Sequence, residues 1–228
     1  MALPARIPFP TGESIEPLRF EREFWIDSPG AVLVGVDEAG RGCLAGPVVA
    51  GAVSIAEEDI ARLAETDLRL VNDSKQLTEK RREQLWECLT QHPNVRYGVG
   101  IASVQEIDAL NILNATHLAM RRAVEALSTP PVYALVDGLP IKGLPIPHSA
   151  IVKGDARSLL IACASIIAKV TRDHLCIEME NRYPGYGFAK HKAYGTKAHL
   201  KALHQLGPCP EHRRTFAPVA VVQEEFNF

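Results

Sequence analysis

Four carboxylates follow short apolar runs of the β type, and glycine or a helix start comes after each run. They are Asp37 and Glu38 in VGVDEAGRG, Asp137 in YALVDG and Asp155 in AIVKGDARS. Carboxylate oxygens without a His or Cys ligand pattern favour a hard cation such as Mg²⁺ or Mn²⁺ over zinc. Oxygen ligands with open positions are also what two-metal phosphodiester chemistry requires. We therefore predict a site for two divalent ions along one edge of a sheet.

Each acid also has an ordinary structural explanation. Neighbours in a strand point to opposite faces, so Asp37 and Glu38 share a site only if the strand ends or bends there; otherwise they are solvated acids of a turn. Asp155 could simply cap the helix that follows it. Asp137 ends a buried strand, where a carboxylate is costly unless it is paired or binds metal. Acids at three strand ends together favour the metal site.

The loop Gly40-Arg41-Gly42 follows the first pair of acids. It matches neither a dinucleotide-binding glycine pattern nor a P-loop, which needs Gly-Lys-Ser/Thr. Glycines on both sides of an arginine still let the backbone approach a ligand closely. The Arg41 guanidinium adds a fork that matches phosphate.

Two further segments carry groups that suit a nucleic acid. Ser74 and Lys75, in Asn-Asp-Ser-Lys before a helix, form a phosphate pocket or an ordinary helix-entry turn. Aromatic and basic residues interleave in a later segment and resemble a base-stacking platform with a basic rim, or a satellite hydrophobic cluster. The members of that segment are Tyr183, Tyr186, Phe188, Lys190, His191, Lys192 and Tyr194.

Residue patterns predict an α/β fold with a mixed five-stranded sheet flanked by helices. The expected strands are 31–37, 46–55, 95–103, 132–138 and 148–155, the first two forming a hairpin. The expected helices include 78–91, 104–128, 156–183 and 196–206, with a capping box at Ser103–Glu106. Small residues in the 156–183 helix, such as Ala164, should let it lie close to the sheet.

The charge distribution is uneven although the net charge is only −2. Residues 1–152 carry 14 basic and 20 acidic side chains, whereas residues 153–214 carry 11 and 5. A basic C-terminal third beside an acidic half fits a phosphate backbone lying across a metal site, or a charge-mixed solvated surface. Five scattered cysteines, no apolar run of membrane-spanning length and no secretory signal suggest a cytoplasmic protein.

Six segments agree in order and spacing with one family: VGVDEAGRG, NDSKQL, LVDG, IVKGDARS with ASIIAKVTRD, YGFAKHKAYGT and HRRTF. From about Val32 to Val219 the chain resembles ribonuclease HII. The resemblance implies a ribonuclease H-like fold with a small C-terminal helical region. It implies a metal-dependent endonuclease that hydrolyses the RNA strand of RNA–DNA hybrids and cuts on the 5′ side of single ribonucleotides in duplex DNA, leaving 3′-hydroxyl and 5′-phosphate ends.

The same resemblance assigns roles to residues. The family's metal-binding catalytic acids match Asp37, Glu38, Asp137 and Asp155, and its loop that senses the 2′-hydroxyl matches Gly40, Arg41 and Gly42. Its phosphate-contacting pair matches Ser74 and Lys75, and its junction-stacking tyrosine matches Tyr194. Two positions depart from the common pattern: Ala193 replaces a usual glycine, which strains it by about 1 kcal/mol if φ is positive, and Cys43 could make the site sensitive to thiol reagents.

The expected organisation is a flexible leader (1–30), a catalytic domain (31–180), a substrate-binding region (181–220) and a tail (221–228). The C-terminal residues Gln223–Phe228 hint at a peptide that binds a sliding clamp; the alternative is a frayed terminus. Rival functions are a ribonuclease HIII, for which the first thirty residues are too short to form the extra domain, a non-catalytic hybrid-binding module and a metal-dependent phosphatase. The sequence leaves open the preferred metal, the balance between substrates and the oligomeric state.

Overall fold

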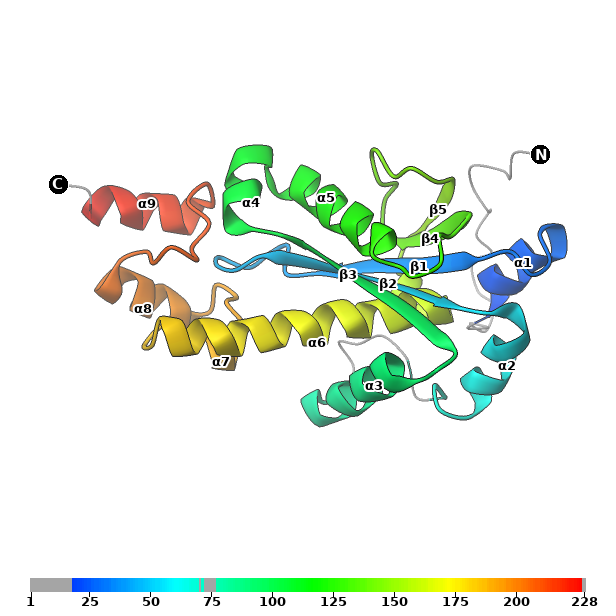
Figure 1. The fold of residues 1–228 in the computed structure, drawn as a ribbon. Helices are drawn as coiled ribbons and strands as arrows, with labels where there is room; N and C mark the ends of the chain where they lie inside the picture. Colours follow the sequence, from blue (N-terminus) through cyan, green and yellow to red (C-terminus); the bar gives the residue numbers. More distant parts are fainter. Residues whose placement is uncertain (1–17, 70, 72–76, 227–228) are drawn as a thin grey trace.

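The computed structural model describes residues 18–69, 71 and 77–226, and its centre is one five-stranded sheet (Figure 1). The strand order is β3-β2-β1-β4-β5. β1, β2 and β3 form an antiparallel meander, and β4 and β5 run parallel to β1. The predicted hairpin and the predicted mixed sheet are confirmed. The strands are β1 (Leu33–Ala39), β2 (Val48–Ile55), β3 (Val95–Ala102), β4 (Tyr133–Asp137) and β5 (His148–Ile151).

Helices cover both faces of this sheet (Figure 1). α4 and α5 lie on one face, and α6 lies on the other with α3 beside it. α7, α8 and α9 gather near the C-terminal end of α6, at the opposite end of the molecule from α1. The helices are α1 (Arg19–Asp27), α2 (Glu57–Glu65), α3 (Glu79–Gln91), α4 (Val104–Leu110), α5 (Ile112–Glu125), α6 (Leu159–Arg182), α7 (Phe188–His191), α8 (Lys197–Leu206) and α9 (Ala217–Phe226).

The two faces of the sheet bury separate hydrophobic clusters. Leu33 and Leu135 pack with α6 residues such as Leu160, whereas Val36 packs with α5 residues such as Met120. Every residue of β2 is buried, as expected for a strand covered on both faces. A Cβ atom on Gly51 would lie 2.4 Å from the Ala164 carbonyl oxygen, so glycine lets α6 approach as closely as its small residues predict.

The leader expected over residues 1–30 does not extend through α1, which belongs to the folded domain. Phe20, Phe24 and Trp25 are buried in the α6-side cluster. The buried Glu21 carboxylate fixes α1 to the start of α6, because its Oε1 accepts hydrogen bonds from Ser158 Oγ at 2.6 Å and Leu160 N at 3.1 Å. The sequence predicts a leader here because the residues before α1 are rich in proline and the apolar stripe of α1 is short.

The prediction of a single helix over residues 104–128 is wrong, because the structure has two helices there. The capping box at Ser103 and Glu106 is present, but α4 ends at Leu110 and α5 starts afresh at Ile112. Asn111 between them has φ 67° and caps α5 by accepting from the Asn114 amide. With ψ 164° this residue lies outside the left-handed helical region, in a conformation that is costly for residues other than glycine, so the helix breaks here although the apolar periodicity continues.

Candidate active site

Asp37 and Asp137 occupy neighbouring positions on parallel strands. The register of β1 and β4 pairs Val36 with Val136, and each aspartate is the next residue of its strand. Side chains at matched positions of a parallel pair point to the same face. The topology therefore brings these two predicted acids together at the C-terminal ends of β1 and β4.

Asp37 is buried, with 4% of its surface exposed. Its Oδ1 accepts a hydrogen bond from the Glu38 amide at 2.7 Å, and the Ser165 side chain on α6 is a second partner. Burial, followed by the negative charges of Glu38 and Asp137, raises the Asp37 pKa well above its usual range. The sequence noted Ser165 only as a small residue, because its contact with Asp37 depends on how α6 lies on the sheet.

Glu38 lies beside the loop that the sequence singled out. Its Oε1 is 3.2 Å from Arg41 Nη1, and its side chain is 13% exposed. Burial raises the Glu38 pKa, Arg41 lowers it, and Asp137 raises it again. Two neighbouring acids of one strand thus both interact with Asp137, although both lie inside β1 rather than at a sharp bend.

Asp155 does not end a strand, contrary to expectation. β5 ends at Ile151, and Asp155 lies in a short 3₁₀ turn over Gly154–Ala156. It is also not the helix cap, since Ser158 caps α6. The turn is anchored to β4, the neighbour of β5 in the sheet, because the Gly154 amide donates to Asp137 Oδ1 at 2.6 Å. Asp155 is buried directly after that anchor.

The donor set suits a hard divalent cation. Asp37, Glu38 and Asp137 interact as like charges in a partly desolvated site, and a bound cation would offset that repulsion. Among residues 18–69, 71 and 77–226, no three His, Cys, Asp or Glu side chains are gathered tightly enough to hold a metal ion as they stand. The carboxylates therefore fit Mg²⁺ or Mn²⁺ by chemistry, without forming a finished cage.

The Gly40-Arg41-Gly42 loop is held from behind by Arg213. This fully buried guanidinium donates to the carbonyl oxygens of Gly40 at 2.7 Å and Arg41 at 2.9 Å. It also donates to the Gly46 oxygen at 2.9 Å. Burial, and then the charge of Arg172, lowers the Arg213 pKa to about 10.

Arg172 of α6 is the second buried guanidinium behind this loop. It donates to the carbonyl oxygens of Ala45 at 3.1 Å, Pro47 at 3.2 Å and Lys192 at 2.9 Å. Gly40 has φ 98°, and a Cβ there would lie 2.0 Å from Arg172 Nε. Sequence reasoning did not single out Arg172 or Arg213. Arg172 follows the apolar first half of α6 and lies among charged residues such as Lys169 and Asp173, so no local pattern marks it.

Tyr194 stands out among the interleaved aromatics. Its side chain is 46% exposed, whereas Tyr186 and Phe188 are buried in a small cluster with Tyr183 packed against it. The stacking platform therefore reduces to Tyr194, and the alternative of a hydrophobic cluster holds for the other rings. Ala193 has φ 62°, so the strain expected of an alanine at a usual glycine position is present.

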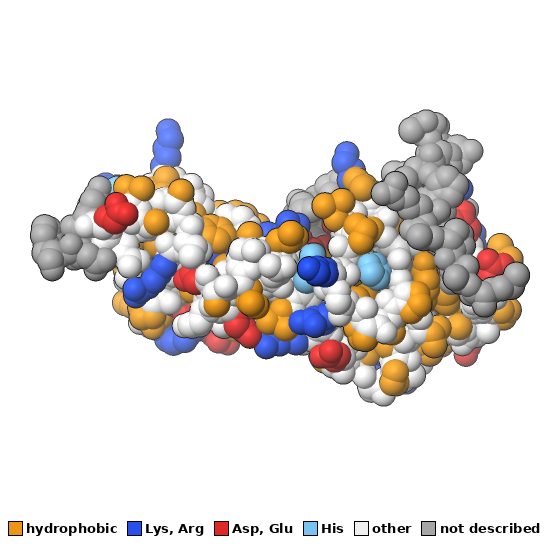
Figure 2. Space-filling view, turned by 90° about the horizontal axis from the view of Figure 1, so that it is seen from above, with side chains coloured by type: hydrophobic (Ala, Val, Ile, Leu, Met, Phe, Trp, Pro, Cys, Tyr) orange, Lys and Arg blue, Asp and Glu red, His pale blue; other side chains and the backbone are white. Residues whose placement is uncertain are grey.

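Basic groups flank the loop on the α5 face. Burial, and then the charges of Arg41, Arg121 and Lys142, lowers the His117 pKa, so each of these cations acts on His117. Figure 2 shows basic and histidine side chains gathered near the middle of this face, and the outline is hollowed between the end with α9 and the body with the sheet. Ser74 and Lys75 lie outside the described residues.

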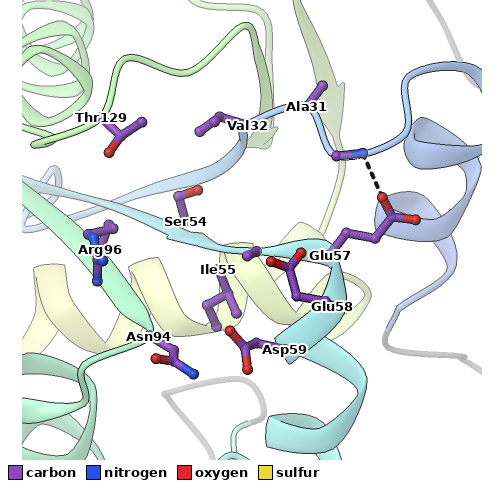
Figure 3. Close-up of a pocket in the computed structure, with 12 residues that line it drawn as sticks. Ala31, Val32, Ser54, Ile55, Glu57, Glu58, Asp59, Asn94, Arg96 and Thr129 are labelled. Atoms are coloured by element: carbon purple, nitrogen blue, oxygen red, sulfur yellow. Dashed lines mark hydrogen bonds between the residues drawn. The ribbon is translucent and has the colours of Figure 1, made fainter.

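A separate pocket lies at the other end of the sheet (Figure 3). Ser54 and Ile55 line it from the last residues of β2, with Glu57 and Arg96 nearby. Glu57 Oε2 accepts a hydrogen bond from the Gly30 amide at 2.7 Å. Because Glu38 pairs with Ala50 near the start of β2, this pocket lies away from the acids and takes no part in their site.

The sheet order and the flanking helices define a ribonuclease H-like fold. The acids at the ends of its strands form a candidate hydrolytic site. The family model described as ribonuclease HII matches residues 34–219, and this chain belongs to the ribonuclease HII family. It is therefore a metal-dependent endoribonuclease that cleaves RNA in RNA–DNA hybrids. In the described residues, no helix is both long and apolar enough to cross a membrane.

Individual relatives agree with the family model. A ribonuclease HII from Syntrophotalea carbinolica is 47% identical over 211 residues, covering 92% of this chain and 96% of that protein. The crystal structure of ribonuclease H2 from Pyrococcus horikoshii OT3 matches with a TM-score of 0.71 at 30% identity, over 86% of this chain and 98% of that one. Ribonuclease HII in its PCNA complex from Archaeoglobus fulgidus has a TM-score of 0.67 at 24% identity, over 84% and 96%, and shows the fold alone.

Proposed function

We propose that this enzyme cuts on the 5′ side of single ribonucleotides in duplex DNA as well as within RNA–DNA hybrids, using two divalent ions. The observation that carries the proposal is the adjacent register of Asp37 and Asp137, with Glu38 and the Gly154–Asp155 turn beside them. Asp37, Glu38, Asp137 and Asp155 are the proposed ligands of Mg²⁺ or Mn²⁺. When bound, such ions supply an activated water and a stabilised leaving 3′-oxygen.

The other residues bind and orient the substrate. The Gly40-Arg41-Gly42 loop is the proposed reader of the ribose, where the 2′-hydroxyl separates RNA from DNA. The exposed Gly42 leaves the backbone open to the substrate, whereas the buried Gly40 lets the loop pack against Arg172. Arg41 forms a salt bridge with Glu38 at 3.2 Å, so a phosphate that engages the guanidinium is held beside the acids. The exposed ring of Tyr194 stacks at the junction and favours deoxyribose on the 3′ side. Ser74 and Lys75 remain proposed phosphate contacts.

One assay tests this function. A duplex with a single embedded ribonucleotide is incubated with Mg²⁺, with Mn²⁺ and with EDTA, beside a long RNA–DNA hybrid, and the cut position is mapped. The proposal expects metal-dependent cleavage 5′ of the ribonucleotide, with 3′-hydroxyl and 5′-phosphate ends. Cleavage of the hybrid alone, or cutting on the other side of the ribonucleotide, would overturn it.

A sliding clamp is the proposed protein partner, through Gln223–Phe228. The Archaeoglobus fulgidus relative is described in complex with PCNA, which supports the proposal by analogy. Val219 and Val222 of α9 are buried in the cluster with Leu203, so a clamp would have to engage residues beyond this anchored part. Pull-down by a clamp that is lost when residues 223–228 are deleted would support the proposal, and no binding by the full chain would end it.

A further inference from the structure

Two buried histidines lie directly behind Tyr194. His199 on α8 and His212 beyond its end are both almost fully buried, and their Nε2 atoms are 3.1 Å apart. The rings of Tyr186 and Phe188 pack around them. The pair is thus shielded from solvent and joined to the chain through its other ring nitrogens.

The direction of each hydrogen bond follows from one fixed donor. The Cys209 amide donates to His212 Nδ1 at 3.0 Å, so that nitrogen carries no proton. A neutral His212 then has its proton on Nε2 and donates to His199 Nε2. His199 in turn carries its proton on Nδ1 and donates to the Tyr194 carbonyl oxygen at 2.9 Å.

This chain of bonds requires both rings to be neutral. A second proton on His199 would set two N–H groups against each other across the 3.1 Å contact. Burial lowers the pKa of both histidines, that of His212 to about 4. At neutral pH the pair therefore presents one N–H, in one direction, to the Tyr194 backbone.

The Tyr194 backbone is in a position that needs such support. The two residues before it, Lys192 and Ala193, have φ 50° and 62°, which costs free energy in residues other than glycine. The Lys192 and Ala193 carbonyl oxygens are held by Arg172 Nη1 and by the Leu44 amide, both at 2.9 Å. The Tyr194 oxygen accepts from His199 and from the Thr196 amide at 2.8 Å.

We propose that His199 and His212 are positioning residues that fix the Tyr194 backbone, and so set the preference for single ribonucleotides over long hybrids. The inference rests on the proposed function, because it assigns Tyr194 a place at the RNA–DNA junction. The histidines act through Tyr194 and do not touch the substrate. A misplacement of about 1 Å at a positioning group can cost a hundredfold in rate. Loss of the hydrogen bond from His199 to the Tyr194 oxygen can therefore change the cleavage rate measurably.

Two substitutions at His199 separate its two contacts. In His199→Asn the amide nitrogen stands where Nδ1 stood and can still donate to Tyr194, whereas the contact with His212 is lost. In His199→Gln the amide oxygen stands where Nε2 stood and can accept from His212, whereas the donor to Tyr194 is lost. His204→Gln, at an exposed histidine of the same helix, is the matched control.

The readout is the ratio of cleavage rates on a single-ribonucleotide duplex and on a long hybrid. We expect His199→Gln to lower this ratio about tenfold and His199→Asn to keep it within about twofold. A ratio unchanged in His199→Gln, or lowered more in His199→Asn, overturns the inference alone. Wild-type protein that cuts hybrids but not single ribonucleotides overturns the proposed function, and this inference with it.

A double variant checks that the effect passes through Tyr194. If His199 acts only by placing that ring, adding His199→Gln to Tyr194→Ala lowers the ratio no further than Tyr194→Ala alone. Additive losses would contradict the inference. If His199→Gln unfolds below the assay temperature, the ratio is measured in His212→Gln, which keeps a donor at the Nε2 position, and in His212→Asn, which does not; the inference expects the lower ratio in His212→Asn.

Discussion

Cys43 and Tyr194 face each other in an isolated antiparallel β-bridge. The Leu44 amide donates to the Ala193 oxygen at 2.9 Å, and the Cys43 and Tyr194 side chains are also hydrogen-bonded. The loop at residues 40–42 and Tyr194 therefore share one backbone framework, although they lie far apart in the sequence. Two groups proposed to recognise the same RNA–DNA junction are fixed relative to each other.

Replacing Tyr194 should change the choice of substrate more than the stability. Tyr194→Ala is expected to slow cleavage at isolated ribonucleotides about tenfold more than cleavage of long hybrids, since one base-stacking contact contributes about 1–3 kcal/mol. Tyr194→Phe keeps the ring and loses only the hydroxyl bonded to Cys43, so it should retain the preference. The measurement is the rate on each substrate under single-turnover conditions. Equal losses on both substrates in Tyr194→Ala would count against the junction role.

The two glycines of the loop should respond differently to alanine. Gly40 has positive φ and no room beside Arg172, so Gly40→Ala should lower the free energy of unfolding by about 2 kcal/mol or more. A Cβ on Gly42 meets nothing within 4 Å, so Gly42→Ala should change stability by less than about 0.5 kcal/mol. Its methyl group would instead occupy the space needed by the substrate backbone and reduce kcat/KM.

Urea denaturation and steady-state kinetics check this pair of variants. Gly42→Ala with normal stability but impaired cleavage would place the substrate against that face of the loop. Wild-type kcat/KM in Gly42→Ala would show that the substrate does not approach there. Normal stability of Gly40→Ala would mean that Arg172 can leave its position without cost.

Much of this site could be predicted from residue order, but its supports could not. Asp37 and Asp137 each follow an apolar run, and two parallel strands then place them together. The sequence predicts a strand that runs to Asp155 because IVK continues the β-like pattern past Ile151, whereas Lys153 takes a left-handed conformation and starts a turn. The local pattern includes Tyr194 among the interleaved aromatics but does not distinguish it from the buried rings beside it; only the family resemblance singles it out.

The buried arginines show why tertiary support escapes sequence reasoning. Arg172 and Arg213 are held mainly by carbonyl oxygens of a loop that precedes both by more than a hundred positions in the chain. Carbonyl oxygens are common to all residues, so no side-chain pattern marks the partner. The tautomer chain through His199 and His212 depends in the same way on backbone groups brought together by folding.

Removing one predicted metal ligand should separate catalysis from binding. Asp37→Asn is expected to reduce cleavage by a factor on the order of a thousand or more, because metal-assisted hydrolysis needs the full carboxylate set. Binding of the hybrid should persist, since Arg41, Tyr194 and the loop remain. Thermal unfolding with and without Mg²⁺ gives a second readout: the wild type should gain stability with the metal, and the variant should gain less.

Asp27→Asn, at an exposed carboxylate at the end of α1, is the control for Asp37→Asn. It should match the wild type in cleavage and in the Mg²⁺-dependent change of Tm. Near-normal turnover by Asp37→Asn would remove this residue from the metal site. Loss of hybrid binding together with cleavage would instead indicate that the substitution disturbs the loop.

The buried Glu21 carboxylate should make stability depend on pH. Burial raises its pKa from 4.5 to about 7, and hydrogen bonds from Ser158 and Leu160 only partly oppose this. Since the folded protein holds the proton more tightly than the unfolded chain, the contribution is complete below about pH 4.5 and is lost as pH rises through about 7. The loss amounts to at most about 3 kcal/mol.

Glu21→Gln removes the titration while its amide oxygen can still accept from Ser158 and Leu160. Between pH 5 and pH 8 the wild type should therefore lose more unfolding free energy than the variant does, as measured by urea denaturation at each pH. Glu23→Gln, on the same helix and paired with Arg19 at the surface, should follow the wild-type pH dependence. Parallel pH profiles for wild type and Glu21→Gln would show that Glu21 titrates normally and that α1 is not held by a protonated carboxyl.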